Sequence, residues 1–365
     1  TIHRLLGAQP DAIYFKHNHE RPIPHDLIIV DESSMIDVAL FAKLLDAVKP
    51  DAKIIFLGDK NQLASVEAGS LFGDLCSAQP ELNLFSRERA DFFNSIIPEG
   101  KTKLNDSFVA NSSHVLFEHI IELQHSYRFT AGGNIGIFSK AIIENDIPIL
   151  EKFLDSGTDD IKIDSAYEAK VLADFAKAYE DYILEPDIKE ALKKLNNLRV
   201  LCALREGPQG LYQTNQQIER YLQEQKLISL NATFYEHRPV IITGNNYELG
   251  LYNGDIGIVR KDDKGKLRVW FEDSEGKLRG IQPAFVSESE TVFAMTIHKS
   301  QGSEFEKVLV RLPEYADNPI LTRELLYTAV TRAKKNVILQ GNKEVILSTC
   351  QRRVKRGSGI ATRFQ

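Results

Sequence analysis

The sequence predicts an α/β fold with mostly parallel sheets and one small antiparallel insert. Short apolar runs recur along the chain, and each is followed by a turn and then a helical pattern, as is typical of buried parallel strands. These runs span residues 27–30, 54–57, 200–204, 240–243, 308–310 and 337–339. Strands that alternate with helices indicate an α/β architecture.

A different pattern over residues 249–290 predicts the antiparallel insert. Asn253-Gly254 and two further glycine-containing turn signals separate short apolar segments at 256–259, 267–271 and 278–281. Such spacing is typical of strands joined by hairpins. A second hairpin is predicted near the start of the chain, at 12–24, where prolines suit an edge ribbon better than a central strand.

Composition narrows the class of protein. The chain has 365 residues, of which 43% are hydrophobic and 26% charged, a mix that fits two or three globular domains and excludes disorder and collagen. No apolar run approaches the ~20 residues of a membrane span. The net charge of −6 argues against coating duplex DNA by bulk charge.

Cysteine and histidine usage gives little sign of a metal or disulfide framework. The three cysteines lie far apart in sequence, which fits a reducing compartment, so we expect a cytoplasmic protein. His17, His19 and His25 could suggest zinc, but no cysteine or carboxylate set completes the ligands nearby. A polar hairpin tip is the better interpretation of these histidines.

Two carboxylates follow the first apolar run. Asp31-Glu32-Ser33-Ser34 would stand at the carboxyl end of a buried strand, where α/β sheets bind ligands. In nucleotide hydrolases one such carboxylate holds Mg²⁺ and a second orients and deprotonates the attacking water. The next run ends in Gly58-Asp59-Lys60-Asn61-Gln62, where a glycine allows close approach and the Gln62 amide could bond both a phosphate and a water.

Three later segments of the sequence also contain candidate functional residues. Arg128 offers a planar guanidinium suited to phosphate. Residues 295–305, which include Thr296 and His298, combine hydroxyls, an imidazole and small residues that suit single-strand phosphates. Arg332 falls near the end of a predicted helix, where an arginine supplied from another domain can act as an arginine finger.

Taken in order, these strings resemble motifs II to VI of the superfamily 1 helicases. The matching segments are 31–34, 57–63, 126–128, 296–305 and 327–333, and residues 1–7 resemble a segment that those helicases place on single-stranded DNA. Within the superfamily, segments 63–69, 201–207 and 251–257 are similar to the RecD family, the helicase (alpha) subunits of exodeoxyribonuclease V (RecBCD). The resemblance covers essentially the whole chain.

The resemblance implies a fold and a domain order. Two RecA-like lobes are expected, with residues 1–125 as the remainder of an incomplete first lobe (1A) that carries a duplex-splitting pin near 12–24. Residues 126–248 and 291–365 would form the second lobe (2A). Residues 249–290 would form an SH3-like β insert (2B).

The resemblance also implies site residues. Asp31 would hold Mg²⁺, Glu32 would be the general base, and Arg128 and Arg332 would stabilise the transferring phosphoryl group. The remaining expected contacts are Gln62, Gly302 and Glu304 to ATP, and His3, Ser65, Arg205, Thr296 and His298 to DNA.

The implied activity is ATP-dependent 5′–3′ DNA unwinding or translocation in DNA repair and recombination. The expected partners are single-stranded DNA, duplex ends, and RecB-like and RecC-like subunits, with no membrane.

One expected motif does not occur. The family's phosphate-binding loop, G-x-x-x-x-G-K-[ST], should precede Asp31, and Gly100-Lys101-Thr102 does not supply it because residue 95 is serine and no apolar strand leads in. Since the chain starts at Thr1, we expect an N-terminally truncated fragment that binds ATP weakly and is inactive alone. A micromolar ATP affinity would contradict this expectation.

Two alternatives stay open. The chain could be an ATPase-inactive scaffold that binds single-stranded DNA or partner subunits, although retention of Glu32, Gln62, Arg128 and Arg332 favours the enzyme. It could also belong to a related superfamily 1 RNA helicase, since no residue pattern distinguishes the sugar of the strand. Competition between DNA and RNA oligomers would decide the second alternative.

Overall fold

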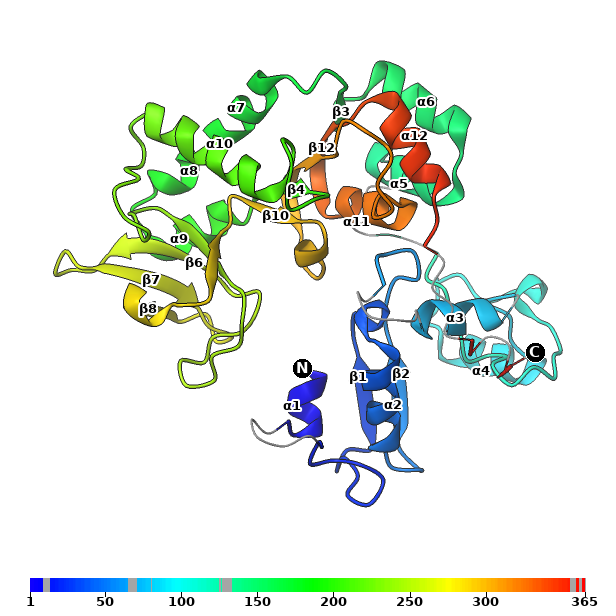
Figure 1. Cartoon of the computed structure of the whole chain (residues 1–365). Coiled ribbons are helices and arrows are strands. Elements are labelled where there is room, and N and C mark those ends of the chain that lie inside the picture. Colours follow the sequence, from blue (N-terminus) through cyan, green and yellow to red (C-terminus); the bar gives the residue numbers. More distant parts are fainter. Residues whose placement is uncertain are drawn as a thin grey trace. The chain divides into compact units, whose positions relative to one another are not determined.

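The computed structural model describes residues 1–8, 14–64, 71–79, 81–124, 126, 133–354, 359–360 and 363–364. The chain divides into two compact units, residues 1–126 with 355–365 and residues 127–354 (Figure 1). Among the described residues, no helix is long and apolar enough to cross a membrane.

The first unit is built on a two-stranded parallel sheet of β1 (Leu27–Val30) and β2 (Lys53–Phe56). Buried Ile28 and Val30 alternate with exposed neighbours and face a core that includes Phe41 of α2 (Val38–Asp46). Phe41 stacks on Phe56, with ring centroids 4.6 Å apart. The other helices of this unit are α1 (Ile2–Leu6), α3 (Leu71–Ala78) and α4 (Arg87–Ile96), with short 3₁₀ turns at Ser33–Met35 and Asp106–Phe108.

The second unit contains a five-stranded parallel sheet in the order β10-β4-β11-β12-β3. Its strands are β3 (Ile161–Asp164), β4 (Leu198–Cys202), β10 (Ala294–Thr296), β11 (Phe305–Arg311) and β12 (Ala333–Gln340). Because all five strands run in parallel, their carboxyl ends meet at one edge of the sheet, where ligands bind in this class of fold.

Two groups of helices pack around this sheet (Figure 1). The first group is α5 (Asn134–Glu144), α6 (Ile147–Ser156), α11 (Arg323–Thr331) and α12 (Lys343–Gln351). The second group is α7 (Ala169–Lys177), α8 (Glu180–Ile183), α9 (Ile188–Leu195) and α10 (Leu211–Glu224).

A second sheet of the same unit is antiparallel, in the order β8-β7-β6-β5-β9. Its strands are β5 (Pro239–Ile242), β6 (Ile256–Lys261), β7 (Leu267–Glu272), β8 (Leu278–Ile281) and β9 (Ser289–Thr291). Val259, Val269 and Phe271 belong to its own apolar cluster. The short 3₁₀ turns Pro283–Phe285 and His298–Ser300 complete the described elements of the unit.

The small antiparallel sheet and the parallel sheet are joined by a buried two-residue link. Only Val292 and Phe293 separate β9 from β10, and both are fully buried. The Tyr179 hydroxyl donates to the Phe293 carbonyl at 2.5 Å, and the buried Arg199 guanidinium donates to the Val292 carbonyl. The link is therefore held by one side chain that precedes α8, Tyr179, and one from strand β4, Arg199.

The structure corrects two predictions about the strands. The run at 240–243 is not a strand of the parallel sheet, because β5 pairs antiparallel with β6 and β9. All four β5 residues are buried, so the run has the continuous apolar pattern of a parallel strand. The edge strand β3 was not predicted, because Lys162 and Asp164 interrupt its apolar pattern.

The hairpin prediction at 12–24 is wrong for the part that the structure describes. In residues 14–24, Asn18 and Arg21 form one isolated antiparallel bridge and no strand is present. The Asn18 side-chain oxygen accepts from the backbone N–H groups of Glu20 and Arg21, which closes a tight polar turn. Pro22 and Pro24 have no N–H to donate to a ladder.

One half-buried histidine makes stability depend on pH. Burial, and then the positive charge of Arg260, lower the pKa of His237 to about 4, against the opposing charge of Glu236. Its ordinary value is about 6.5, so the unfolded chain binds more protons between these two values. Stability is therefore expected to fall as the pH drops from about 6.5 towards 4.

Denaturant unfolding of the second unit between pH 7 and pH 4 tests this expectation. The variant His237→Gln is expected to lose stability less steeply with falling pH, whereas the matched variant of the exposed His25, His25→Gln, should keep the wild-type slope. An unchanged slope in His237→Gln would show that this imidazole does not contribute.

Candidate functional site

The carboxyl ends of β1 and β2 bring two predicted site segments together. The strands pair in register from Leu27 opposite Lys53 to Val30 opposite Phe56. Beyond the sheet the pairing continues, because Leu57 N donates to the Val30 carbonyl at 2.7 Å and Ser33 N donates to the Leu57 carbonyl at 2.8 Å. The loop after β1 is thus joined by hydrogen bonds to the loop after β2.

The first loop holds Asp31 and Glu32 in a constrained conformation. Glu32 has a left-handed backbone, with φ 51° and ψ 40°, which costs a residue with a side chain of the order of 1–3 kcal/mol. Asp31 Oδ1 accepts from Glu32 N at 2.8 Å, and the fully buried Ser33 hydroxyl donates to the Val30 carbonyl at 3.0 Å. Asp31 itself is exposed, so its carboxylate is open to solvent.

The second loop holds Gln62 beside Asp59. The Asp59 carboxylate accepts from Asn61 N at 2.9 Å and from Gln62 Nε2 at 3.2 Å. The other end of the amide, Gln62 Oε1, is buried without a hydrogen-bond partner among the described residues. An unsatisfied buried acceptor costs about 1–3 kcal/mol, so a ligand or water that donates to this oxygen would be stabilised.

Gly58 is required where the two loops meet. A Cβ at this position would lie 3.0 Å from a ring carbon of Phe72 and 3.2 Å from Ser34 N. The absence of a side chain therefore lets the two loops approach each other closely.

The residues present fit a nucleotide-bound Mg²⁺ better than a metal held by the protein alone. Within the described residues, no group of three or more His, Cys, Asp or Glu side chains could hold a metal ion. Mg²⁺ commonly keeps several waters and takes one or two carboxylates together with phosphate oxygens. A single exposed carboxylate such as Asp31 is sufficient for that arrangement.

In the second unit, the segment after β10 forms a compact polar turn. Thr296 ends the strand, and its hydroxyl oxygen accepts from Lys299 N at 3.3 Å. His298 opens the 3₁₀ turn, in which the Ser300 hydroxyl donates to the Ile297 carbonyl at 2.7 Å. Gly302 has φ 75° and open space around it, which leaves its backbone accessible.

Arg332 connects this segment to α11. It follows the last residue of the helix, and its side chain is almost completely buried. Nε donates to the Thr328 carbonyl at 3.3 Å and Nη1 donates to the Ser303 carbonyl at 3.1 Å. The neighbouring Glu304 carboxylate pairs with Lys334 at 3.1 Å.

Arg205 belongs to a cluster of charges that sequence reasoning missed. Arg205 Nη1 lies 3.7 Å from Glu290 Oε1 and donates to the Tyr212 hydroxyl at 3.3 Å. The Lys299 ammonium donates to the other oxygen of Glu290 at 2.9 Å. Glu290 therefore joins two cationic side chains. Because it lies far from Arg205 in sequence, the sequence alone could not predict this contact.

The remaining predicted residues are placed as follows. His3 lies on α1, with its ring edge against Phe15 at 5.7 Å between centroids. Ser65 and Arg128 lie outside the described residues. The structure thus brings Asp31, Glu32 and Gln62 to one pair of loops, and links Arg332 to the segment that carries Gly302.

Comparison with known proteins adds the family. Residues 1–68 match the model of an AAA domain, residues 291–340 match a UvrD-like helicase C-terminal domain, and residues 214–271 match an ATP-dependent RecD-like DNA helicase SH3 domain. With the three sheets and the loops described above, these matches define a superfamily 1 helicase architecture of RecA-like lobes and an SH3-like β domain.

The curated proteins that are similar to this chain over its whole length include RecD subunits. The RecBCD enzyme subunit RecD of Mycobacterium tuberculosis is 36% identical over 370 residues, covering 100% of this chain and 58% of that protein. The subunit of the same name in Haemophilus influenzae is 33% identical, covering 99% and 58%. Over essentially its whole length the chain is similar to these RecD subunits, and it spans 58% of their length.

A more distant curated relative carries a related name. The ATP-dependent RecD2 DNA helicase of Deinococcus radiodurans is 27% identical, covering 100% of this chain and 43% of that protein. Among solved structures, Pif1 helicase from Bacteroides, in complex with ADP-AlF3 and single-stranded DNA, aligns at 15% identity and a TM-score of 0.45, covering 97% and 81% of the two chains.

Proposed function

We propose that this chain forms the motor of an ATP-dependent DNA helicase that moves 5′ to 3′ on single-stranded DNA in repair and recombination. The observation that carries the proposal is the hydrogen-bonded pair of loops after β1 and β2, which holds Asp31, Glu32 and Gln62 at one edge of a parallel sheet. A scaffold that only binds DNA has no chemical need for this arrangement.

In the proposed reaction, Glu32 accepts the proton of the water that attacks the terminal phosphate. Asp31 would hold Mg²⁺, which would supply positive charge to the phosphates. Gln62, with its unsatisfied Oε1, orients a water or hydroxyl donor beside the phosphate. Arg128 and Arg332 stabilise the charge of the transferring phosphoryl group, while Gly302 and Glu304 contact the nucleotide.

The DNA contacts proposed are His3, Ser65, Arg205, Thr296 and His298. Residues 12–24 act as the pin that divides the duplex, through the polar turn at Asn18 and Arg21 and not through a two-stranded hairpin. Further partners are duplex ends and RecB-like and RecC-like subunits, because the named relatives are subunits of the RecBCD enzyme. Residues 1–125 serve as lobe 1A, residues 126–248 with 291–365 as lobe 2A, and residues 249–290 as the 2B insert, with two changes to these bounds. The strand β5 joins the small antiparallel sheet of the insert, and residues 355–365 group with the first unit.

The function is tested with the protein at its native full length, since this chain spans 58% of its named relatives. ATP hydrolysis should be stimulated by single-stranded DNA, and strand displacement should occur on duplexes with a 5′ tail but not with a 3′ tail. Failure of DNA to stimulate hydrolysis would favour a scaffold, and equal stimulation by RNA oligomers would contradict DNA as the track.

Arg205 gives a prediction for DNA binding alone. Arg205→Ala is expected to weaken binding of an oligo-dT strand about three- to tenfold and to lower the salt slope of log K by about 0.7, the value for one phosphate contact on a single strand. Fluorescence anisotropy at several salt concentrations measures both quantities. The control Lys264→Ala removes an exposed cation from the β6–β7 turn and should leave both unchanged.

A further inference from the structure

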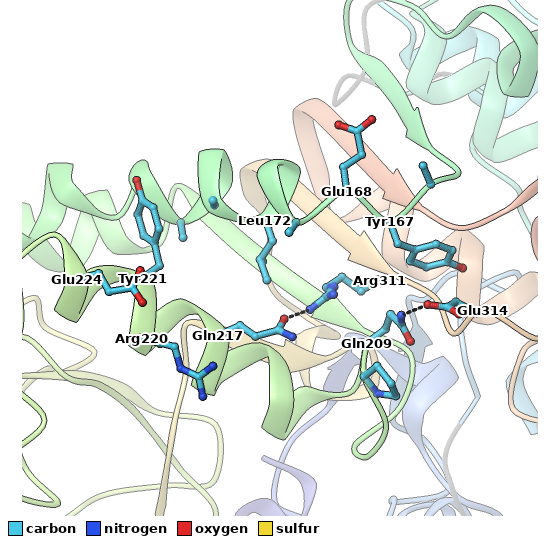
Figure 2. A pocket seen from close by; sticks show the side chains of 15 residues that line it. Tyr167, Glu168, Leu172, Gln209, Gln217, Arg220, Tyr221, Glu224, Arg311 and Glu314 are labelled. Atoms are coloured by element: carbon cyan, nitrogen blue, oxygen red, sulfur yellow. Dashed lines mark hydrogen bonds between the residues drawn. The ribbon is translucent and has the colours of Figure 1, made fainter.

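A cavity of about 420 Å³ in the second unit is used by none of the residues assigned above (Figure 2). Its volume lies within the range of about 300–1,000 Å³ that is typical of small-molecule sites. It opens at the carboxyl edge of the parallel sheet, where Arg311 ends the central strand β11. This is the edge at which α/β sheets bind ligands.

The two long walls of the cavity differ in character. The α7 wall is apolar, and the α10 wall is mostly polar. The α7 residues that line it are Ala169, Leu172, Ala173 and Ala176, and those of α10 are Gln217, Arg220, Tyr221 and Glu224. Both sets follow the spacing of one helix face, so the walls are regular helix surfaces rather than irregular gaps.

Arg311 forms the floor of the cavity. Among the described residues no carboxylate forms a direct ion pair with it, although the charge of Asp164 acts on it from a longer distance. Arg311 is 6% exposed. Nε donates to Gln340 Oε1 at 2.8 Å, and Nη1 donates to the Thr214 hydroxyl at 2.7 Å and to Gln217 Oε1 at 3.0 Å. All three acceptors are neutral, and burial lowers the pKa of the guanidinium, which nevertheless stays charged at neutral pH.

The remaining terminal nitrogen of Arg311, Nη2, has no acceptor among the described residues. This nitrogen keeps some exposure, and Arg311 lines both this cavity and a smaller neighbouring one. A buried cation that makes no direct ion pair is costly, and an anion that enters the cavity would offset that cost.

The other charged side chains of the lining are three carboxylates and the Arg220 guanidinium, so they limit the charge of an anion that could bind here. Glu314 already accepts from Gln209 Nε2 at 2.8 Å, and Figure 2 shows the Glu168 carboxylate pointing away from Arg311. Glu168 and Glu224 are exposed, and their charge disfavours a doubly charged anion. A phosphodiester carries one negative charge.

The cavity also offers groups that suit a ring with hydrogen-bonding edges. Gln217 uses only its oxygen towards Arg311, and Gln209 uses only its nitrogen towards Glu314. One amide donor and one amide acceptor therefore remain available, opposite the apolar wall of α7. This combination matches a nucleobase next to its phosphate.

We propose that this cavity binds one nucleotide unit, with its singly charged phosphate on Arg311 and its base between α7 and α10. That the nucleotide belongs to a DNA strand rests on the proposed function. The loop 204–210 carries both Arg205 and Gln209, so a strand bound at Arg205 could continue into the cavity. A nucleotide within a strand and a free nucleotide share this chemistry.

Binding of an oligo-dT strand and of a small diester, the cyclic nucleotide 3′,5′-cAMP, to the intact chain tests the proposal. Arg311→Gln is expected to weaken both about tenfold, as is typical for loss of a charge-assisted hydrogen bond, and to lower the salt slope for the strand by about 0.7. Ala173→Met fills the cavity while leaving the bonds of Arg311 intact, and it should weaken both ligands as well.

The control variant is Arg238→Gln, which removes another buried guanidinium with neutral acceptors, Thr291 Oγ1 and the Thr233 carbonyl, away from the cavity. It should change thermal stability but not the salt slope. If Ala173→Met and a folded Arg311→Gln both bind like the wild type, the proposal is overturned, whatever Arg205→Ala does. If the diester binds through Arg311 but no strand binds, the cavity site stands and the proposed function fails.

Discussion

Replacing Glu32 with glutamine is expected to reduce kcat for DNA-stimulated ATP hydrolysis by about 10²–10⁴-fold in the full-length protein, the usual range for loss of a general base. Glutamine keeps the size of the side chain and its position after β1, but it cannot accept the proton of the attacking water. ATP and DNA affinities should stay within about threefold of the wild type, because no binding contact is removed.

Steady-state kinetics with saturating oligo-dT measures this effect. The matched control is Glu88→Gln on α4, an exposed carboxylate in the first turn of that helix, which should leave kcat unchanged. Intact DNA-stimulated hydrolysis in Glu32→Gln would show that the catalytic base is another group.

The second large effect is expected at Arg332. An arginine that meets charge on the transferring phosphoryl group contributes about 10³–10⁵ in kcat. Arg332→Lys keeps the positive charge but cannot reproduce the two bonds to the Thr328 and Ser303 carbonyls. A fall in kcat of at least about 10³-fold is therefore expected even with lysine.

The structural part of this effect can be measured separately. Loss of the bond to Ser303 should loosen the segment that carries Gly302, so hydrogen exchange there should increase and the thermal midpoint should fall. Lys335→Ala, which removes an exposed lysine paired with Glu306 at 2.6 Å, is the control. A normal kcat in a folded Arg332→Lys variant would exclude the finger role.

Sequence reasoning performed best where turn chemistry and apolar runs agree. The strands at 27–30 and 278–281 coincide with β1 and β8, because clear turn or charged residues bound both runs. The run at 54–57 is displaced by one residue from β2, since Lys53 pairs with Leu27 although its side chain is exposed. Ladder hydrogen bonds, rather than side-chain polarity, set that boundary.

Sheet membership was harder to predict than strand existence. β5 is apolar at every position because its two faces are both covered, and local pattern does not report whether the neighbours run parallel or antiparallel. The partners β6 and β9 lie at very different distances along the chain, so only long-range pairing decides the sheet.

For the candidate sites, residue types were predictable and contacts were not. The loops with Asp31 and Gln62 could be placed at one edge because both strands are parallel. The sequence around Glu290 and Arg311 did not indicate their roles. Glu290 pairs with Lys299 and Arg205. Arg311 donates to Gln340 and Thr214. Charges that meet through the tertiary fold have no periodicity to detect.

The two-residue link between β9 and β10 determines how force would pass through the second unit. Rotation of the small sheet against the large one would require breaking the bonds from Tyr179 and Arg199 and exposing Phe293 to water. We therefore expect the link to resist bending, so that a load on the rim of the small sheet would pass to Thr296 and the turn beyond it. The small β domain would then act as a stiff extension of β10, the strand that ends at Thr296.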